Sequence, residues 1–317
     1  MNALKKRLGP WVNRSVWLTT IWFFADNLLA SLRIKKPGPP KQDHLSGESI
    51  EADITYSTNV VENYAKFGAA KGRVAEIGPG GSAATALLMI ERGAESVELL
   101  DRFVYPHDQS MLNRTYSIII GRSPKLTALF PDPANLSAHV RFETGEPAAA
   151  ERYFKKHKGY DAVCSCAVLE HLFDPILALK RMTAALNLGG KLVHYVDFRD
   201  HAMYTAGGLH ELTFLTIPGW FYPHMSRRRG RPNRVLIGEY RAACAELGLD
   251  FQILATSLVG VGLIEHMPFA EVPAELRAKA EARVEEIRGK LAEPYRSMAA
   301  CDLAIDSIAF IATKPST

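Results

Sequence analysis

Two acidic side chains, Glu76 and Asp101, follow apolar segments at positions where a carboxylate can meet a ligand. Glu76 lies two residues before Gly78, and Asp101 closes the next apolar segment about 25 residues after Glu76, near the roughly 20 expected where an acid meets ribose hydroxyls. A carboxylate ahead of a glycine turn repels a pyrophosphate and attracts an ammonium group. This pattern predicts a cofactor that carries both a nucleoside and a positive charge.

The residues between these two acids predict a strand, a glycine turn and a helix. Residues 74–77 form a short apolar strand, Gly78 and Gly80 form the turn, and residues 82–92 have the composition of a helix. The glycine spacing also fits the relaxed dinucleotide fingerprint, so an NAD-dependent oxidoreductase is an alternative. S-adenosyl-L-methionine has an ammonium and a sulfonium but no phosphate, and it fits Glu76 better.

Two segments of the chain resemble a known family. The run Val74-Ala-Glu-Ile-Gly-Pro-Gly-Gly81, together with Asp101, resembles the first two motifs of the class I S-adenosylmethionine-dependent methyltransferases. A further match is the apolar strand 160–166, which opens with Asp161 and runs into Leu169-Glu-His171. In the family this turn lies at the carboxyl edge of the sheet beside the sulfonium. The resemblance implies methyl transfer from S-adenosyl-L-methionine, and it is close over residues 74–200 and looser afterwards.

The resemblance also implies which residues bind the cofactor. In the family an acidic residue after the third strand contacts the adenine amino group; Glu146 holds that position, and Glu143 is the competing choice. Arg102, just past the ribose ligand, is expected to flank the adenine ring, and Cys166 and Ala167 are expected to contribute backbone near the methionine end. The predicted cofactor-binding residues are Glu76, Gly78, Gly80, Asp101, Arg102, Glu146, Cys166 and Ala167.

Histidines and arginines near the expected methyl group are candidates for acceptor chemistry. Methyl transfer is an in-line displacement, and a base is needed only if the acceptor must lose a proton. Histidine suits that role because its ordinary pKa, about 6.5, lies near operating pH. We predict His171 and His201 as catalytic residues, with structural hydrogen bonding as the alternative for each. Arg199 and Arg234 are predicted to bind the substrate.

Residues 202–234 are predicted to form a lid inserted after the fifth strand, above the expected methyl group. The basic run at residues 226–234 favours an acceptor that is small and either anionic or sugar-like, because guanidinium groups bind carboxylate and phosphate well. Solvated surface charge is the alternative. Nucleic acid is not favoured, since the run lacks interleaved aromatic residues and the net charge of the chain is only +4.

The alternation of strands and helices predicts an α/β fold with a seven-stranded, mostly parallel, Rossmann-like sheet and helices on both faces. With 317 residues, 47% of them hydrophobic, the chain can bury a large core. We expect an N-terminal helical extension and linker at residues 1–56 and a methyltransferase domain at residues 57–317. A long amphipathic helix is expected from Pro273 to Tyr295.

The N-terminal extension is the part that the resemblance does not explain. Its apolar run, which contains Trp17 and Trp22, is interrupted by Asp26 and Asn27 and is too short to span a bilayer. One interpretation is a helix that packs on the catalytic domain or on a second subunit of a homodimer. The other is an interfacial helix in which residues 11–36 contact anionic lipid. A non-catalytic protein at a membrane surface is therefore another function class.

The cysteines do not indicate a metal site or a disulfide framework. They lack paired CxxC spacing and lie in apolar surroundings, so we expect reduced thiols in the core and no metal. Reduced thiols are typical of the cytoplasm, and we expect the protein there. Association with the inner surface of the membrane is the further expectation. The four residues are Cys164, Cys166, Cys244 and Cys301.

Overall fold

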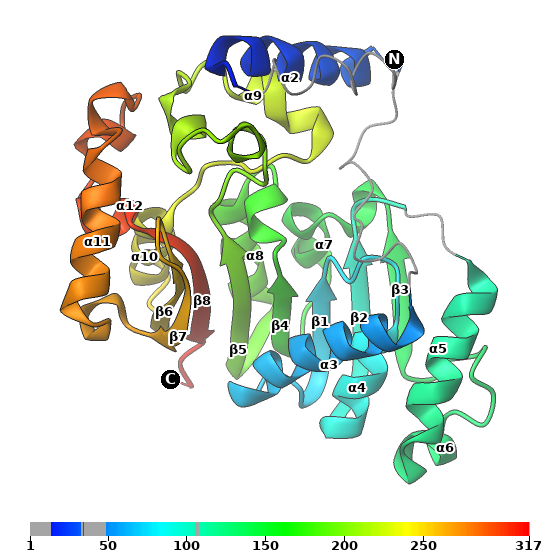
Figure 1. Ribbon diagram of the computed structural model, residues 1–317. Coiled ribbons are helices and arrows are strands. Elements are labelled where there is room, and N and C mark those ends of the chain that lie inside the picture. The colour runs from blue at the N-terminus through cyan, green and yellow to red at the C-terminus, as the bar shows by residue number, and fades with distance from the viewer. Residues whose placement is uncertain (1–13, 33, 35–48, 105–107, 317) are drawn as a thin grey trace.

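The computed structural model describes residues 14–32, 34, 49–104 and 108–316, which form a single sheet with helices packed on both faces (Figure 1). Each face of the sheet covers its own cluster of buried apolar side chains. The strands are β1 (Gly72–Ile77), β2 (Ala94–Asp101), β3 (Val140–Thr144), β4 (Tyr160–Cys166), β5 (Leu186–Asp197), β6 (Asp250–Leu258), β7 (Gly262–Met267) and β8 (Ile305–Thr313).

The strand order is β3-β2-β1-β4-β5-β8-β6-β7. Strands β1 to β5 are parallel, and β8 runs antiparallel to both β5 and β6. The chain moves outward through β2 and β3 and then returns to β4 on the other side of β1. Ligands of open parallel sheets bind at the carboxyl ends of the strands where the order reverses in this way, so the position between β1 and β4 is the expected ligand site.

The expected fold class is confirmed, but the expected number of seven strands is wrong, because the sheet has eight. The additional strand is β7, which pairs antiparallel with β6 at the edge of the sheet. Its side chains are exposed or half-buried, and Leu263 is 84% exposed. An edge strand of this kind has no regular alternation of apolar and polar residues, so its sequence carries little strand signal.

Helices on the two faces begin and end where their sequences favour it. For example, Asp174 accepts a hydrogen bond from the Leu177 backbone N–H at 2.9 Å, and Pro175 occupies the first helical position of α8. The helices of one face are α3 (Ile50–Lys66), α4 (Ala84–Arg92), α5 (Gln109–Gly121) and α6 (Pro124–Leu129). Those of the other face are α7 (Ala150–Lys156), α8 (Pro175–Ala185) and α10 (Ile237–Glu246).

Two expected boundaries differ from the structure. The expected division between residues 56 and 57 falls inside α3, whose buried side chains pack against α4. The helix expected from Pro273 to Tyr295 ends early, because α11 covers only Ala274–Glu285. Short 3-10 turns follow it, η8 at Arg288–Lys290 and η9 at Tyr295–Ser297. Gly289 and Pro294 both disfavour a continuous helix there.

The segment expected as a lid consists of short helices above the carboxyl edge of the sheet (Figure 1). These are η4 (Thr205–Gly207), η5 (Thr213–Thr216), α9 (Pro223–Ser226) and η6 (Arg227–Arg229). The N-terminal helix α2 (Val16–Ser31) lies across α9 and η6. No helix in the described part of the chain has both the length and the apolar character needed to cross a bilayer.

Helix α2 turns its polar residues toward the lid and most of its apolar residues outward. Thr20 shares a hydrogen bond of 2.9 Å with the Tyr204 hydroxyl, and the Asn27 side-chain amide donates to the His224 carbonyl at 2.9 Å. The buried residues of α2 are Thr19, Thr20, Asp26, Asn27 and Ala30. The exposed apolar residues on and just after the helix are Trp17, Leu18, Ile21, Phe24, Leu28 and Leu32.

Candidate active site

A cavity of about 320 Å³ lies at the carboxyl ends of β1, β2 and β4, at the point where the strand order reverses. Residues of α3 close one side, and Gly230 of the lid contributes from above. Nine of the residues predicted from the sequence line this cavity. They are Glu76, Gly78, Gly80, Asp101, Arg102, Cys166, Ala167, His171 and His201.

The glycine turn after β1 adopts a backbone that other residues rarely adopt. Gly78 and Gly80 have φ angles of +72° and +70°. A Cβ atom on Gly78 would lie 2.4 Å from a methyl group of Val168, and the Gly78 N–H donates to the Leu100 carbonyl at 2.8 Å. Glycine at position 78 therefore allows the turn to pack directly against the segment that follows β4.

Glu76 presents a buried carboxyl group at the floor of the cavity. It accepts hydrogen bonds from the Tyr64 hydroxyl, at 3.2 Å, and from the Thr85 hydroxyl. Burial raises its pKa to about 7, although both hydroxyl groups act in the opposite direction. A cationic ligand beside Glu76 would favour the ionised carboxylate, so this position suits an ammonium group.

Asp101 lies at the end of β2 and lines the same cavity as Glu76. Its carboxylate accepts a hydrogen bond from the Phe103 backbone N–H at 2.8 Å. Burial raises its pKa to about 6, against the opposing effect of the Phe103 and Gly80 backbone N–H groups. Asp101 thus offers a buried acceptor to hydroxyl groups of a ligand in the cavity.

The cavity wall next to Asp101 differs in part from the expectation. Arg102 lines the cavity, but its guanidinium group pairs with Glu151 at 2.7 Å and lies 4.1 Å from the centre of the Phe173 ring. Glu146, expected to meet adenine, is 56% exposed, pairs with Arg152 at 3.4 Å, and is not among the described residues that line the cavity. That wall is instead formed by residues the sequence analysis did not single out, Phe103, Leu112, Ala148, Ala149 and Ala150.

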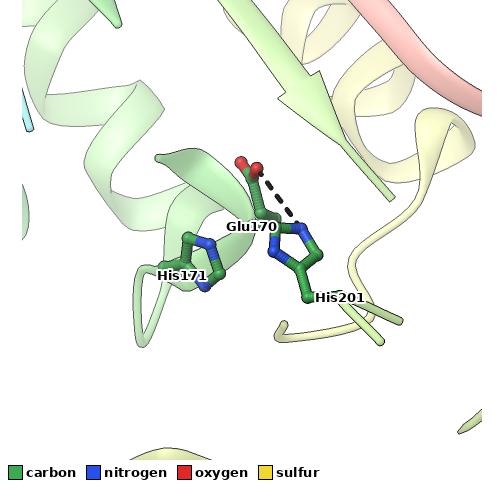
Figure 2. Close-up of side chains that lie close together, drawn as sticks. All are labelled: Glu170, His171 and His201. Carbon is green, nitrogen blue, oxygen red and sulfur yellow. Dashed lines mark ion pairs between the residues drawn. The ribbon is translucent and has the colours of Figure 1, made fainter. Parts of the chain in front are cut away.

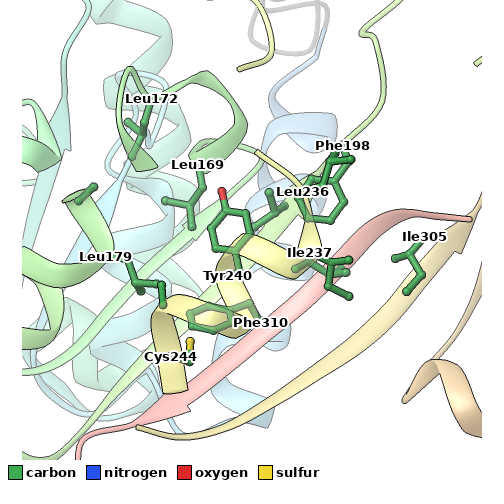
Figure 3. Close-up of a cluster of buried hydrophobic side chains, with 14 of the residues drawn as sticks. Leu169, Leu172, Leu179, Phe198, Leu236, Ile237, Tyr240, Cys244, Ile305 and Phe310 are labelled. Carbon is green, nitrogen blue, oxygen red and sulfur yellow. The ribbon is translucent and has the colours of Figure 1, made fainter. Parts of the chain in front are cut away.

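A strained turn follows β4. Ala167 has a φ angle of +55°, which is uncommon for a residue other than glycine, and its N–H donates to the Tyr195 carbonyl at 2.9 Å. Leu169 and Leu172 anchor the 3-10 turn η3 (Leu169–His171) in a buried apolar cluster with Tyr240 (Figure 3). These anchors fix the two residues between them: His171 lines the cavity, and Glu170 is buried behind it.

The two predicted catalytic histidines lie together at the lid side of the cavity (Figure 2). The rings of His171 and His201 are 4.7 Å apart, edge to face. Burial lowers the pKa of His171 to about 3, so this ring is neutral at pH 7. The His201 side chain is 29% exposed, and its Nε2 lies 3.7 Å from Asp197 and 3.8 Å from Glu170.

The two arginines predicted to bind the substrate are placed elsewhere. Arg199 forms a two-pronged contact with Asp197, at 2.8 and 2.5 Å. Arg234 is buried in the lid, where it donates to the Ile217 carbonyl at 2.6 Å and stacks 3.9 Å from the centre of the Tyr222 ring. Neither residue is among the described residues that line the cavity. Their guanidinium groups have partners at the end of β5 and in the lid, and their role in substrate binding stays a prediction.

Comparisons with known proteins place this site in a family. A family described as a methyltransferase domain matches residues 54–250. No curated protein matches the chain significantly. Similar solved structures include an S-adenosylmethionine-dependent methyltransferase from Archaeoglobus fulgidus, with 15% identity, a TM-score of 0.44, and coverage of 86% of this chain and 100% of that one. Another is a putative sarcosine dimethylglycine methyltransferase from Galdieria sulphuraria, with 12% identity and a TM-score of 0.43. The match covers 93% of this chain and 99% of that one.

Structural similarities of this size say nothing about the acceptor. The family match, however, covers more than half of the chain, and it includes the glycine turn, Asp101 and the turn η3. The chain belongs to the methyltransferase-domain family.

Proposed function

We propose that the cavity binds S-adenosyl-L-methionine with the methionine end at Glu76 and the ribose at Asp101. The observation that carries this proposal is the pair of buried carboxyl groups that line the cavity together with the glycine turn. An ammonium group favours the ionised form of Glu76, and ribose hydroxyls donate to Asp101. A dinucleotide would bring its pyrophosphate to the glycine turn next to Glu76, which disfavours a nicotinamide cofactor.

The described residues fit the remaining parts of this cofactor. The apolar wall of Phe103, Leu112 and residues 148–150 suits the faces of an adenine ring. Cys166 and Ala167 line the cavity between the two acids and the histidines, as expected for residues near the sulfonium. When bound, the cofactor supplies a methyl group on a positively charged sulfur atom.

The acceptor enters on the lid side, where His171 and His201 face the cavity. We propose a small acceptor that presents an oxygen, nitrogen or sulfur nucleophile to the methyl group in line. A neutral acceptor must lose a proton, and His201 is the better base of the two because burial holds the pKa of His171 near 3. The placement of Arg199 and Arg234 favours a polar, sugar-like acceptor over one that is bound by an arginine clamp.

A labelled-methyl assay tests this function. Purified protein is incubated with methyl-labelled S-adenosyl-L-methionine and fractions of a metabolite extract, and labelled products are identified by mass spectrometry. We expect one class of small product, no product with Asp101→Ala, and turnover at pH 7 reduced about 100-fold in His201→Asn. Equal labelling by wild type and Asp101→Ala would contradict the proposal.

We also propose that the outer face of α2 rests on an anionic lipid surface. Isolated exposed apolar side chains are ordinary, but here Trp17, Ile21 and Leu28 form an exposed apolar stripe on one helix. Phe24 of the same helix stacks on Phe221 of the lid, whose ring contacts the exposed Trp220. Exposed arginines precede α2 and lie in η6, which contacts α2, and cations and tryptophans near an apolar face are typical of membrane-surface helices. The other residues of the expected contact, 11–13, 33, 35 and 36, lie outside the described residues.

The packing of α2 and α3 indicates where the N-terminal extension ends. Because α3 packs in the catalytic core and α2 packs on the lid, we propose that the N-terminal extension ends before Ser49 rather than at residue 56. A second copy of the chain is the other occupant that would cover the stripe. Vesicle binding and oligomeric state, measured together, distinguish these two occupants.

A further inference from the structure

Three side chains of the types that bind metal ions meet at the acceptor end of the cavity (Figure 2). Glu170 and His171 belong to the turn after β4, and His201 belongs to the loop after β5, which is the neighbouring strand. One ligand atom from each residue lies within 4.8 Å of the other two. His171 and His201 both line the cavity. The sequence did not reveal this cluster, because His201 lies 30 positions after His171 and only the parallel pairing of β4 and β5 brings their loops together.

The polar atoms of this cluster lack the partners that buried groups normally have. The Glu170 side chain is 2% exposed, and no described side chain donates a hydrogen bond to its carboxyl oxygens. The backbone N–H groups of Glu170 and Asp197 face this carboxyl group but do not reach the geometry of full hydrogen bonds. The Nδ1 atom of His171 is also buried and has no described partner. His201 approaches Glu170 only to 3.8 Å, which is too long for a hydrogen bond. Unpartnered buried polar atoms are rare and indicate a missing ion, water or ligand.

We propose that Glu170, His171 and His201 bind a divalent cation whose remaining coordination positions open into the cavity. Two imidazoles and one carboxylate form a ligand set typical of zinc, iron(II) and manganese, whereas magnesium and calcium prefer oxygen ligands alone. Metal–ligand bonds of about 2.0–2.2 Å require the three groups to close slightly around the ion. The His201 side chain has the most room for that movement, because it is 29% exposed whereas the Glu170 side chain is 2% exposed.

This inference rests on the proposed function, because it names the acceptor class of the same site. The cation binds a hydroxyl oxygen of the acceptor and lowers its pKa, so that the hydroxyl proton leaves to water. The oxygen then attacks the methyl carbon as the carbon–sulfur bond breaks, giving the methyl ether and neutral S-adenosylhomocysteine. The cation thereby takes over the role assigned above to His201 as a base. The acceptor class is a hydroxyl compound with a second oxygen donor beside it, which can chelate the ion.

Metal binding to the full chain tests the proposal without relying on activity. The protein is stripped with EDTA, dialysed, and titrated by calorimetry with ZnCl₂, MnCl₂ and MgCl₂, and bound metal is counted by elemental analysis. We expect one zinc or manganese ion per chain, a rise in melting temperature on binding, and weaker binding of magnesium. In His201→Asn and Glu170→Gln we expect the zinc Kd to rise at least about 100-fold, since even loss of an outer-shell partner costs 10–100-fold.

His224→Asn is the matched control, because it removes an exposed lid histidine outside the cluster. His201→Asn keeps the test decisive if Glu170→Gln fails to fold, since asparagine tolerates the left-handed backbone at position 201. Absence of stoichiometric metal, or an equal zinc Kd in wild type and His201→Asn, would overturn the inference. S-adenosylhomocysteine is titrated into the same samples. If S-adenosylhomocysteine binds but no metal does, the proposed function stands and only the cation site is refuted. If metal binds but S-adenosylhomocysteine does not, the cation site is supported and the proposed function is contradicted.

Discussion

The carboxylate of Asp26 in α2 lies 2.6 Å from the guanidinium group of Arg231 in the lid, and it also accepts from Arg229 at 2.9 Å. Asp26 and Arg231 are 205 positions apart in the sequence. The basic run that was expected to clamp an anionic acceptor therefore holds the N-terminal helix instead. Since Gly230, between these two arginines, lines the cavity, α2 and the roof of the active site form one packed unit.

Replacing Asp26 with asparagine is expected to loosen this unit. The substitution leaves the nearly buried guanidinium group of Arg231 without its carboxylate, a loss of about 3 kcal/mol. We predict a melting temperature lower by several degrees and faster cleavage after α2 in limited proteolysis. Arg227→Ala, which changes an exposed lid arginine, is the control and is expected to behave like wild type. Identical proteolysis of Asp26→Asn and wild type would show that the pair does not hold α2.

The exposed stripe of α2 predicts binding to lipid vesicles. A variant with Trp17→Ser, Ile21→Ser and Leu28→Ser is expected to bind phosphatidylserine vesicles at least ten times more weakly in sedimentation, because three exposed apolar anchors are lost. Leu263→Ser removes a more exposed leucine, 84% against 44% for Leu28, from the distant strand β7 and is expected to have no effect. Unchanged vesicle binding by the triple variant would refute the lipid contact, and a dimer that only the triple variant loses would identify a second copy as the occupant.

Gly78→Ala is expected to damage the cofactor turn. The new methyl group meets Val168 at 2.4 Å, and alanine at a φ angle of +72° adds strain, so we expect a loss of about 2 kcal/mol or more and weaker binding of S-adenosylhomocysteine. Gly208→Ala is a matched control, with a φ angle of +78° but no described atom within 4 Å of the added Cβ. Chemical denaturation measures both. Equal losses in the two variants would mean that backbone strain alone, and not packing against Val168, explains the effect.

Glu76 predicts a dependence of stability on pH. Its pKa is about 7 in the folded protein and 4.5 ordinarily, so the folded state holds a proton that the unfolded state releases. The contribution of Glu76 is therefore fully present below pH 4.5 and is lost as the pH rises to about 7, a change of about 3 kcal/mol. Glu76→Gln cannot ionise and should lose less stability than wild type between pH 4.5 and 8 in denaturation curves. Parallel pH profiles for the two proteins would contradict this assignment.

The same carboxyl group predicts proton release on ligand binding. An ammonium group beside Glu76 favours the ionised form, so binding of S-adenosylhomocysteine at pH 6 should release a proton. The number of protons released should decrease above pH 7, where Glu76 is already ionised in the free protein. Calorimetry in two buffers of different ionisation enthalpy measures this release. Glu76→Gln should reduce it, leaving only the contribution of Asp101, whose pKa of about 6 also responds to the ligand.

The features that the sequence predicted well are those that lie close together along the chain. The strand and glycine turn around Gly78, the carboxylate of Asp101 at the end of a strand, and the turn that presents His171 are each encoded within about ten residues. Parallel pairing of β1, β2 and β4 then brings them to one edge of the sheet. Their shared position in one cavity follows from topology as much as from sequence.

The features that the sequence predicted poorly depend on distant partners. Nothing near Arg231 in the sequence indicates that it pairs with Asp26, and nothing near Glu146 indicates that its side chain is 56% exposed and close to Arg152 on the next helix. The unpartnered carboxyl group of Glu170 is visible only once the surrounding chain is folded. Such relationships are set by packing between elements, which short-range patterns do not encode.

Titration of the purified protein with S-adenosylhomocysteine and, separately, with NAD tests the central claim most directly. The account predicts one molecule of S-adenosylhomocysteine per chain with a clear rise in melting temperature, a Kd at least tenfold weaker in Asp101→Ala, and no binding of NAD. Tight binding of NAD with no heat from S-adenosylhomocysteine, or equal affinity of Asp101→Ala and wild type, would contradict the assignment of this cavity.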